Sequence, residues 1–241
     1  MERTGPDNPV FCALDTPDLG AARVLASRLK GSVGGLKLGL EFFVAFGPAG
    51  VGAVAREGLP IFLDLKFHDI PNTVAGAVGA AVALGPAFLT IHAAGGREMM
   101  RRAAEAAANA AQRQGVPRPR LVGVTVLTSL GPDDMGEIGF AKTPADQVLK
   151  LAALAQDAGL DGVVCSAHEI AAVRKECGAD FTLVVPGIRP SSTSADDQKR
   201  VMGPAEAMRR GADYLVIGRP ITAAADPAEA ARRIMAEIAG G

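Results

Sequence analysis

The sequence of 241 residues contains no tryptophan and only one tyrosine, three histidines and three cysteines. The cysteines, Cys12, Cys165 and Cys177, are odd in number and irregularly spaced. That pattern argues against a disulfide framework and favours reduced thiols in a cytoplasmic protein. The histidines form no H-E-x-x-H motif and no tight ligand spacing, so we expect no metal site.

An excess of either charge is also missing. Lysine and arginine number 25 against 26 aspartate and glutamate, which gives a formal net charge of -1. This balance excludes the basic surface of a nucleic-acid binder or a polybasic membrane patch. The N-terminal MERTGPDNPV lacks the apolar core of a signal peptide.

Long apolar runs are scarce. The run from Ala75 to Ile91 nearly reaches the length of a membrane span, but Gly85-Pro86 interrupts it. Alanine and glycine dominate its first half, so it predicts an Ala-rich helix followed by a short strand, and no membrane partner.

Short β-rich runs alternate with helical stretches from one end of the chain to the other. The expected strands cover residues 10–15, 35–40, 60–66, 88–93, 121–128, 162–166, 182–187 and 214–220. Between them lie amphipathic or Ala-rich segments, such as GREMMRRAAEAAANAAQRQG, that mostly end at glycine. Eight such units predict a single α/β domain over residues 1–241, a (β/α)8 TIM barrel.

Polar residues recur where the expected strands end. They are Asp15, Lys37, Asp64, Lys66, His92, Thr128, Ser166, Arg189 and Arg219. In a (β/α)8 barrel the C-terminal ends of the strands meet at one face and carry the active site. We therefore expect the active site at that face.

The strand in LPIFLDLKFHDIPNT (residues 59–73) ends with an acid and a base. Side chains alternate along a strand, so Asp64 and Lys66 should point the same way, and Lys37 ends the preceding strand. A carboxylate between two ammonium groups keeps all three ionised in a partly dry site. The spacing alone also allows a structural salt bridge without catalysis.

The loops after the seventh and eighth strands predict a phosphate site. Barrels commonly bind phosphate there, and these loops hold Arg189, Arg219 and Gly218. Glycine permits close backbone approach, and arginine forms strong hydrogen bonds to phosphate. The alternative for Arg219 is an ordinary surface cation.

The motif D-x-K-x-x-D, in the fuller form DLKFHDIPNT, resembles orotidine 5′-phosphate decarboxylases of the bacterial type. Three further segments resemble that family in the same order: VTVLTSL (124–130), PGIRP with DDQKR (186–190 and 196–200) and GADYLVIGRPI (211–221). The resemblance implies decarboxylation of orotidine 5′-phosphate to UMP, the last step of de novo pyrimidine nucleotide synthesis, without a cofactor.

The resemblance also implies a catalytic charge network of Lys37, Asp64, Lys66 and Asp69. Lys66 would stabilise the ring carbanion and then protonate it, which suits an ammonium fixed where negative charge develops. In the family the residue at the position of Asp69 enters the active site of the neighbouring subunit. The resemblance therefore implies a homodimer in which Asp69 and Thr73 cross the interface.

The implied nucleotide contacts extend beyond this network. Asp15 and Thr73 would contact the ribose, and Thr128 the pyrimidine edge, while Ser129 is either a second such contact or a loop cap. The implied substrate-binding residues are Asp15, Lys37, Asp64, Lys66, Asp69, Ile70, Thr73, Thr128, Arg189, Gln198, Gly218 and Arg219.

Two other functions fit a barrel of this kind. A metal-assisted sugar-phosphate decarboxylase or aldolase would need carboxylates for a divalent cation, and Glu41 is the spare acid after the second strand. A phosphate-ligand binder or pentose-phosphate epimerase would not need Asp64 and Lys66 beside Lys37. Activity that survives a chelator would count against the metal-assisted alternative.

Overall fold

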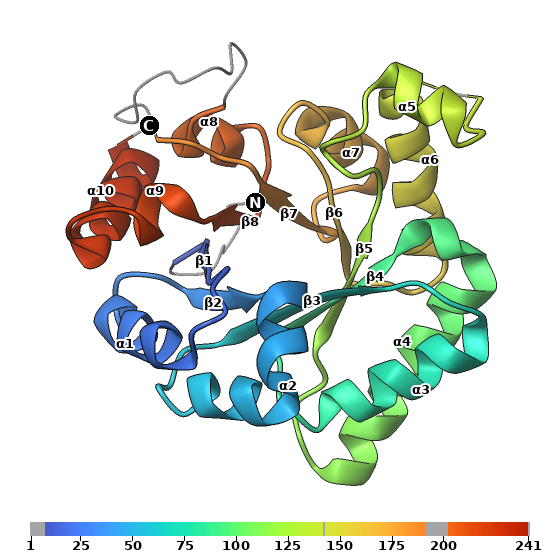
Figure 1. Ribbon diagram of the computed structural model, residues 1–241. Helices are drawn as coiled ribbons and strands as arrows, with labels where there is room; N and C mark the ends of the chain where they lie inside the picture. Colours follow the sequence, from blue (N-terminus) through green and yellow to red (C-terminus); the bar gives the residue numbers. More distant parts are fainter. Residues whose placement is uncertain (1–7, 142, 191–201, 241) are drawn as a thin grey trace. The chain divides into compact units, whose positions relative to one another are not determined.

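Parallel strands alternate with helices throughout the computed structural model, which describes residues 8–141, 143–190 and 202–240 (Figure 1). The strand order is that of a closed barrel, β1 to β8 in sequence order. The (β/α)8 prediction is confirmed. The strands are β1 (Val10–Ala13), β2 (Gly35–Leu38), β3 (Ile61–Phe67), β4 (Phe88–His92), β5 (Arg120–Val124), β6 (Gly162–Val164), β7 (Thr182–Pro186) and β8 (Tyr214–Ile217).

The predicted strands all form, but β5 and β8 end earlier than the apolar pattern indicated. After Val124 the chain soon turns, and the N–H of Leu130 donates to the carbonyl of Leu127. After Ile217, Gly218 has φ -103° and ψ -105°, which ends the extended conformation. Apolar side chains after Val124 extended the prediction for β5, whereas the prediction for β8 ran on through Gly218, Arg219 and Pro220.

The helices begin and end at residues typical of caps. They are α1 (Leu19–Leu29), α2 (Leu40–Ala55), α3 (Pro71–Val82), α4 (Gly96–Gln114), α5 (Pro132–Glu137), α6 (Pro144–Asp157), α7 (Ile170–Cys177), α8 (Pro204–Arg209), α9 (Arg219–Thr222) and α10 (Pro227–Gly240), with the 3₁₀ helix η1 (Ala93–Gly95). Asp18 and Thr143 accept hydrogen bonds from the first turns of α1 and α6. Left-handed Gly115 ends α4.

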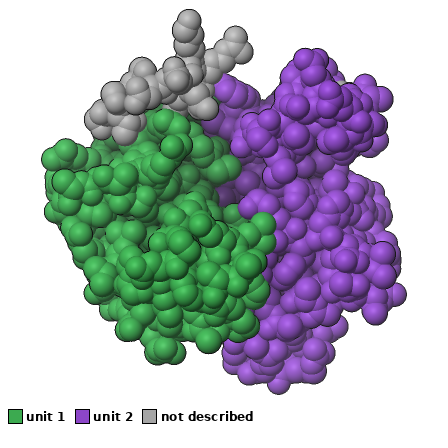
Figure 2. Space-filling model, in the orientation of Figure 1, with its two compact units in different colours: residues 1–64, 185–241 green, residues 65–184 purple. Residues whose placement is uncertain are grey.

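The chain divides into two compact units, which Figure 2 colours green and purple. The first unit comprises residues 1–64 and 185–241. In it β1 pairs in parallel with β2 and with β8, and β2 pairs with β3. Aromatic edges fill its interior: the Phe11 ring lies 5.8 Å from the rings of both Phe62 and Tyr214.

The second unit comprises residues 65–184. Its strands pair in the order β4, β5, β6 and β7, again in parallel. Helix α3 packs against α4, and α6 against α7. Helix α4 buries Met99, Met100 and a row of alanines, so small side chains let helices approach closely on this side.

The interrupted apolar run forms a helix and a strand, as predicted. Its first part lies in α3 and its last part in β4. In the described portions of the chain, no helix combines the length and apolarity that a membrane crossing requires.

Candidate active site

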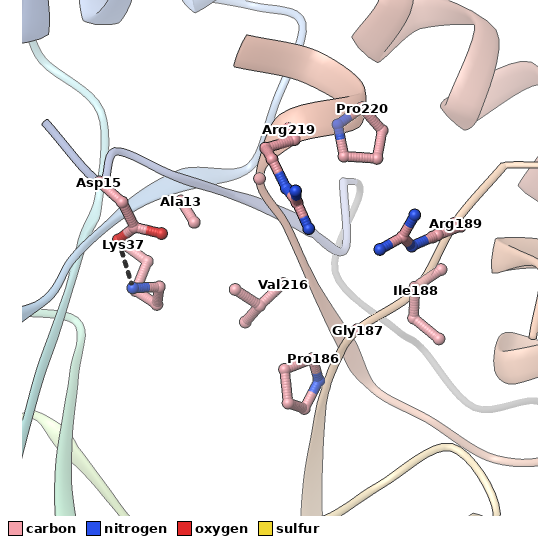
Figure 3. A pocket seen from close by; sticks show the side chains of 11 residues that line it. Ala13, Asp15, Lys37, Pro186, Gly187, Ile188, Arg189, Val216, Arg219 and Pro220 are labelled. Carbon is pink, nitrogen blue, oxygen red and sulfur yellow. Dashed lines mark hydrogen bonds and ion pairs between the residues drawn. The ribbon is translucent and has the colours of Figure 1, made fainter. Parts of the chain in front are cut away.

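A cavity of about 470 Å³ opens in the first unit at the C-terminal ends of its strands. Five residues predicted for the site line it: Asp15, Lys37, Arg189, Gly218 and Arg219. Figure 3 shows Asp15 and Lys37 on one side of the cavity and the two arginines on the other. Between them lie the apolar side chains of Pro186, Ile188 and Val216 (Figure 3). The cavity thus has two charged ends joined by an apolar wall.

The ammonium of Lys37 lies between two carboxylates. Its Nζ is 3.2 Å from Oδ1 of Asp15 and 3.6 Å from Oδ2 of Asp64. The side chains of Lys37 and Asp64 are only 12% and 11% exposed, so water screens this pair weakly, whereas that of Asp15 is 59% exposed. The predicted pairing of Lys37 with Asp64 is therefore present, and Asp15 adds a contact that the sequence did not indicate.

The guanidinium groups of Arg189 and Arg219 face each other at the opposite end (Figure 3). Within the described residues, no carboxylate forms an ion pair with either group. Two like charges that face one cavity repel each other unless an anion lies between them. Arginine also matches the geometry of phosphate oxygens, so this end suits a phosphate.

Lys66 lies in the second unit and has an unusual backbone. Its φ of 50° makes it the one non-glycine residue with positive φ in the described parts of the chain. Such conformations are unfavourable for residues with a Cβ and cluster at functional sites. The alternation rule assumes an extended backbone, so it does not by itself fix the direction of the Lys66 side chain.

The residues after β3 are exposed. Asp69, Ile70 and Thr73 all lie at the solvent surface around the start of α3, and Ile70 is 67% exposed. Oδ1 of Asp69 accepts a hydrogen bond of 2.6 Å from the N–H of Ile70. The resemblance assigns Asp69 and Thr73 to a partner's site and Ile70 to substrate binding.

Four other positions considered in the sequence differ in how far the structure describes them. Thr128 and Ser129 are exposed in the loop after β5 and belong to no strand. His92 is half-buried at the end of β4, and its ring lies 5.2 Å from that of His68. Gln198 lies outside the described residues.

The thiol of Cys12, which precedes the lining residue Ala13, is unreactive near neutral pH. Cys12 is fully buried in β1, and burial raises the pKa of its thiol to about 12, with the Asp15 carboxylate adding to the rise. A thiol needs a lowered pKa to act as a nucleophile near neutral pH. Cys12 is therefore a packing residue.

No cluster of three histidine, cysteine, aspartate or glutamate side chains capable of holding a metal ion occurs within residues 8–141, 143–190 and 202–240. Glu41, the spare acid, lies in the first turn of α2 and is exposed.

Sequence reasoning missed two neighbours of the charged groups. Thr90 is buried in β4 and accepts a hydrogen bond from the N–H of Lys66. A Cβ on Gly39 would lie 3.1 Å from Nζ of Lys37. A polar residue inside the apolar run FLTIH was the available signal for Thr90, whereas Gly39 gave none beyond its place before a helix.

Comparisons with known proteins agree over nearly the whole chain. The sequence profile of the "Orotidine 5'-phosphate decarboxylase / HUMPS family" matches residues 8–234. The chain is 58% identical over 231 residues to orotidine 5'-phosphate decarboxylase of Paramagnetospirillum magneticum, covering 96% of this chain and 98% of the relative. It is 59% identical over 234 residues to that of Rhodospirillum rubrum, covering 97% and 95%. The crystal structure of the Lactobacillus acidophilus decarboxylase superposes with a TM-score of 0.86 at 37% identity, covering 96% of this chain and 99% of that one.

Proposed function

The chain belongs to the orotidine 5′-phosphate decarboxylase family, and from that membership we propose how its residues carry out the reaction. The protein converts orotidine 5′-phosphate into UMP and carbon dioxide in pyrimidine biosynthesis. The observation that supports this best is the cavity with the Asp15–Lys37–Asp64 group at one end and two arginines at the other. A nucleotide has a reacting ring at one end and a phosphate at the other.

Lys66 supplies the chemistry. Loss of carbon dioxide leaves an electron pair in the plane of the pyrimidine ring, where the ring cannot readily delocalise it. A fixed ammonium stabilises this charge as it develops, and the same group then donates the proton that replaces the carboxylate. The reaction needs neither a metal nor an organic cofactor, because Lys66 provides both the charge and the proton.

Lys37, Asp64 and Asp69 hold the charges in place. Asp64 is 8% exposed, and its ion pair with Lys37 offsets part of the cost of burying a carboxylate. Asp64 lies on β3, two residues before Lys66 in the sequence. Preorganised charges of this kind require no rearrangement during the reaction.

The phosphate binds between Arg189 and Arg219. Gly218 has no side chain, so the phosphate can lie close to its backbone. A phosphate far from the reacting carbon contributes binding energy that positions the ring. Asp15 and Thr73 contact the ribose, Thr128 the pyrimidine edge, and Ile70 and Gln198 complete the substrate contacts. The support for the phosphate end is the pair of facing guanidinium groups on the cavity wall.

A homodimer completes each site, with Asp69 and Thr73 reaching across the interface. Both residues are exposed in the isolated chain, as a residue that serves a partner must be. Leu40 and Val44, one turn apart on α2, are 53% and 83% exposed, and Ile70 is 67% exposed. Large exposed apolar side chains of this kind favour burial against a second copy.

The protein is cytoplasmic, and residues 1–241 form a single domain. Three unpaired cysteines support the location, because cytoplasmic thiols stay reduced. The divisions between the compact units fall inside β3 and β7, after Asp64 and before Val185. Domain boundaries ordinarily fall in exposed linkers, so divisions inside strands favour one domain.

Loss of absorbance from orotidine 5′-phosphate tests the reaction directly. We expect turnover to be the same with and without a chelator. Loss of activity on chelation, restored by a divalent cation, would support the metal-assisted alternative instead.

Replacement of Lys66 tests the mechanism. Lys66→Ala should abolish turnover while the variant keeps its circular dichroism spectrum and still binds UMP, because a general acid alone contributes about 10² to 10⁴-fold. Lys175→Ala, at an exposed lysine in the last turn of α7, is the matched control and should have wild-type activity. Retained turnover in Lys66→Ala would remove Lys66 from the mechanism.

A further inference from the structure

The backbone of Lys66 is held in a conformation that lysine adopts rarely. Its φ is 50°, in the left-handed region, although it lies within strand β3. A residue with a Cβ stays in this region only when its surroundings hold it there. Neighbouring groups must therefore stabilise this one peptide unit.

Thr90 is one such group. It lies in β4 with no exposed surface, and its Oγ1 accepts a hydrogen bond of 2.8 Å from the N–H of Lys66. Within a sheet a strand N–H ordinarily donates to a backbone carbonyl of the neighbouring strand. Here a side-chain hydroxyl accepts a hydrogen bond from the Lys66 N–H, so the identity of residue 90 decides whether this acceptor is present.

A second contact joins the same two segments two residues further along. The ring of His68 lies 5.2 Å from that of His92, with 34° between the ring planes. His68 follows Lys66 by two residues, and His92 follows Thr90 by two. Side chains of β4 therefore contact this segment both at Lys66 itself and two residues after it.

We propose that Thr90 is a positioning residue for Lys66. Its hydroxyl holds the Lys66 N–H, which stabilises the left-handed φ and thereby sets the direction of the Lys66 Cα–Cβ bond. This inference rests on the proposed catalytic role of Lys66. In this role Thr90 acts through the backbone of Lys66, and the role needs no contact with the substrate.

The direction of that bond matters because the lysine side chain is long. A change in φ rotates the whole side chain, so the ammonium at its end moves further than any backbone atom. A displacement of about 1 Å at a reacting group can lower the rate about 10²-fold. A buried hydroxyl that accepts a hydrogen bond from this backbone can therefore affect turnover.

Thr90→Val tests this role, because valine has nearly the same shape and lacks the acceptor. We expect kcat to fall about 10 to 100-fold, KM to stay within about threefold, and hydrogen exchange at the Lys66 amide to become at least about tenfold faster. Thr90→Ser restores the hydroxyl and should return kcat and amide exchange to within about threefold of wild type.

Thr125→Val is the matched control. Thr125 is also buried in the second unit, and its hydroxyl donates to the carbonyl of Val164 and not to a residue of β3. It should lower the thermal stability about as much as Thr90→Val and leave kcat unchanged. Thr90→Ala serves as a second acceptor-free variant if Thr90→Val does not fold.

Three results would overturn the proposal. They are wild-type kcat in the acceptor-free variants, equal losses of kcat in Thr90→Val and Thr125→Val, or a Thr90→Ser variant as slow as Thr90→Val. Wild-type protein that fails to turn over orotidine 5′-phosphate would instead refute the proposed function. In that case exchange at the Lys66 amide still decides whether Thr90 holds this backbone.

Discussion

At the scale of single residues, Lys37 contacts two carboxylates beside the cavity. Its Nζ pairs with Asp15 and Asp64, and the Asp64 carboxylate is buried. Lys37→Met keeps the length of the side chain but leaves Asp64 without this cation. We expect kcat/KM to fall about 10²-fold or more, because the charges that Lys37 holds are no longer preorganised.

Steady-state kinetics with orotidine 5′-phosphate measure this loss. Lys150→Met, at an exposed position in α6, is the control and should leave kcat/KM unchanged. Similar values for Lys37→Met and wild type would show that the ion pair contributes nothing to turnover.

The buried thiol of Cys12 should make the free energy of unfolding depend on pH in the alkaline range. Burial raises the pKa of its thiol from 9.0 to about 12. Between these values the unfolded chain loses this proton while the folded protein keeps it, so the free energy of unfolding falls as pH rises. The slope from this one group approaches about 1.4 kcal/mol per pH unit, and the effect is absent below pH 9.

Urea unfolding at a series of pH values checks this prediction. Cys12→Ala lacks the titrating group, so its free energy of unfolding should fall less steeply than that of wild type above pH 9. Identical slopes for the two proteins would mean that the folded thiol titrates as readily as the unfolded one.

At the scale of helices and strands, the turn between β2 and α2 positions a charge. A Cβ on Gly39 would lie 3.1 Å from Nζ of Lys37 and 3.5 Å from Oδ1 of Asp15. The φ of Gly39 is -97°, so alanine is allowed there conformationally. Gly39→Ala should therefore lower kcat/KM about 3 to 10-fold through this contact, with little change in stability.

A second glycine provides the control. A Cβ on Gly79, inside α3, meets nothing within 4 Å. Gly79→Ala should leave kcat/KM unchanged and raise the free energy of unfolding by about 0.5–1 kcal/mol, because alanine favours the helix. Equal activity in the two variants would show that Lys37 accommodates the added methyl group without cost.

Secondary structure was predictable from periodicity alone, while its ends were not. Short apolar runs between helical stretches located every strand, because a strand buried on both faces needs a continuous apolar segment. The ends of β5 and β8 depend on the backbone at Leu127 and Gly218, which hydropathy does not describe. The left-handed φ of Lys66 is likewise invisible in the sequence, because lysine has no preference for it.

At the scale of the whole molecule, the site residues that lie at the ends of strands were predictable from the sequence. Asp15, Lys37, Arg189, Gly218 and Arg219 follow from strand order, because parallel strands end at one face. Their mutual contacts, such as that of Asp15 with Lys37, depend on side-chain conformations in three dimensions. The roles proposed for Asp69 and Thr73 would depend on a second copy of the chain, which one chain does not contain.

Hybrid dimers test that dependence. Neither Lys66→Ala nor Asp69→Ala should be active alone, but refolding the two together in equal amounts should restore about a quarter of wild-type activity. Half of the dimers are then hybrids, and each hybrid has one site with Lys66 from one subunit and Asp69 from the other. The absorbance assay measures the recovery. A mixture that stays inactive would place Asp69 in the site of its own subunit.

The cavity takes its walls from both ends of the chain, from residues 13–37 and from residues 186–220. More than half of the sequence lies between these two segments. A chain that stops before Arg219 lacks part of the cavity wall. UMP added during refolding should therefore stabilise only molecules that contain both segments.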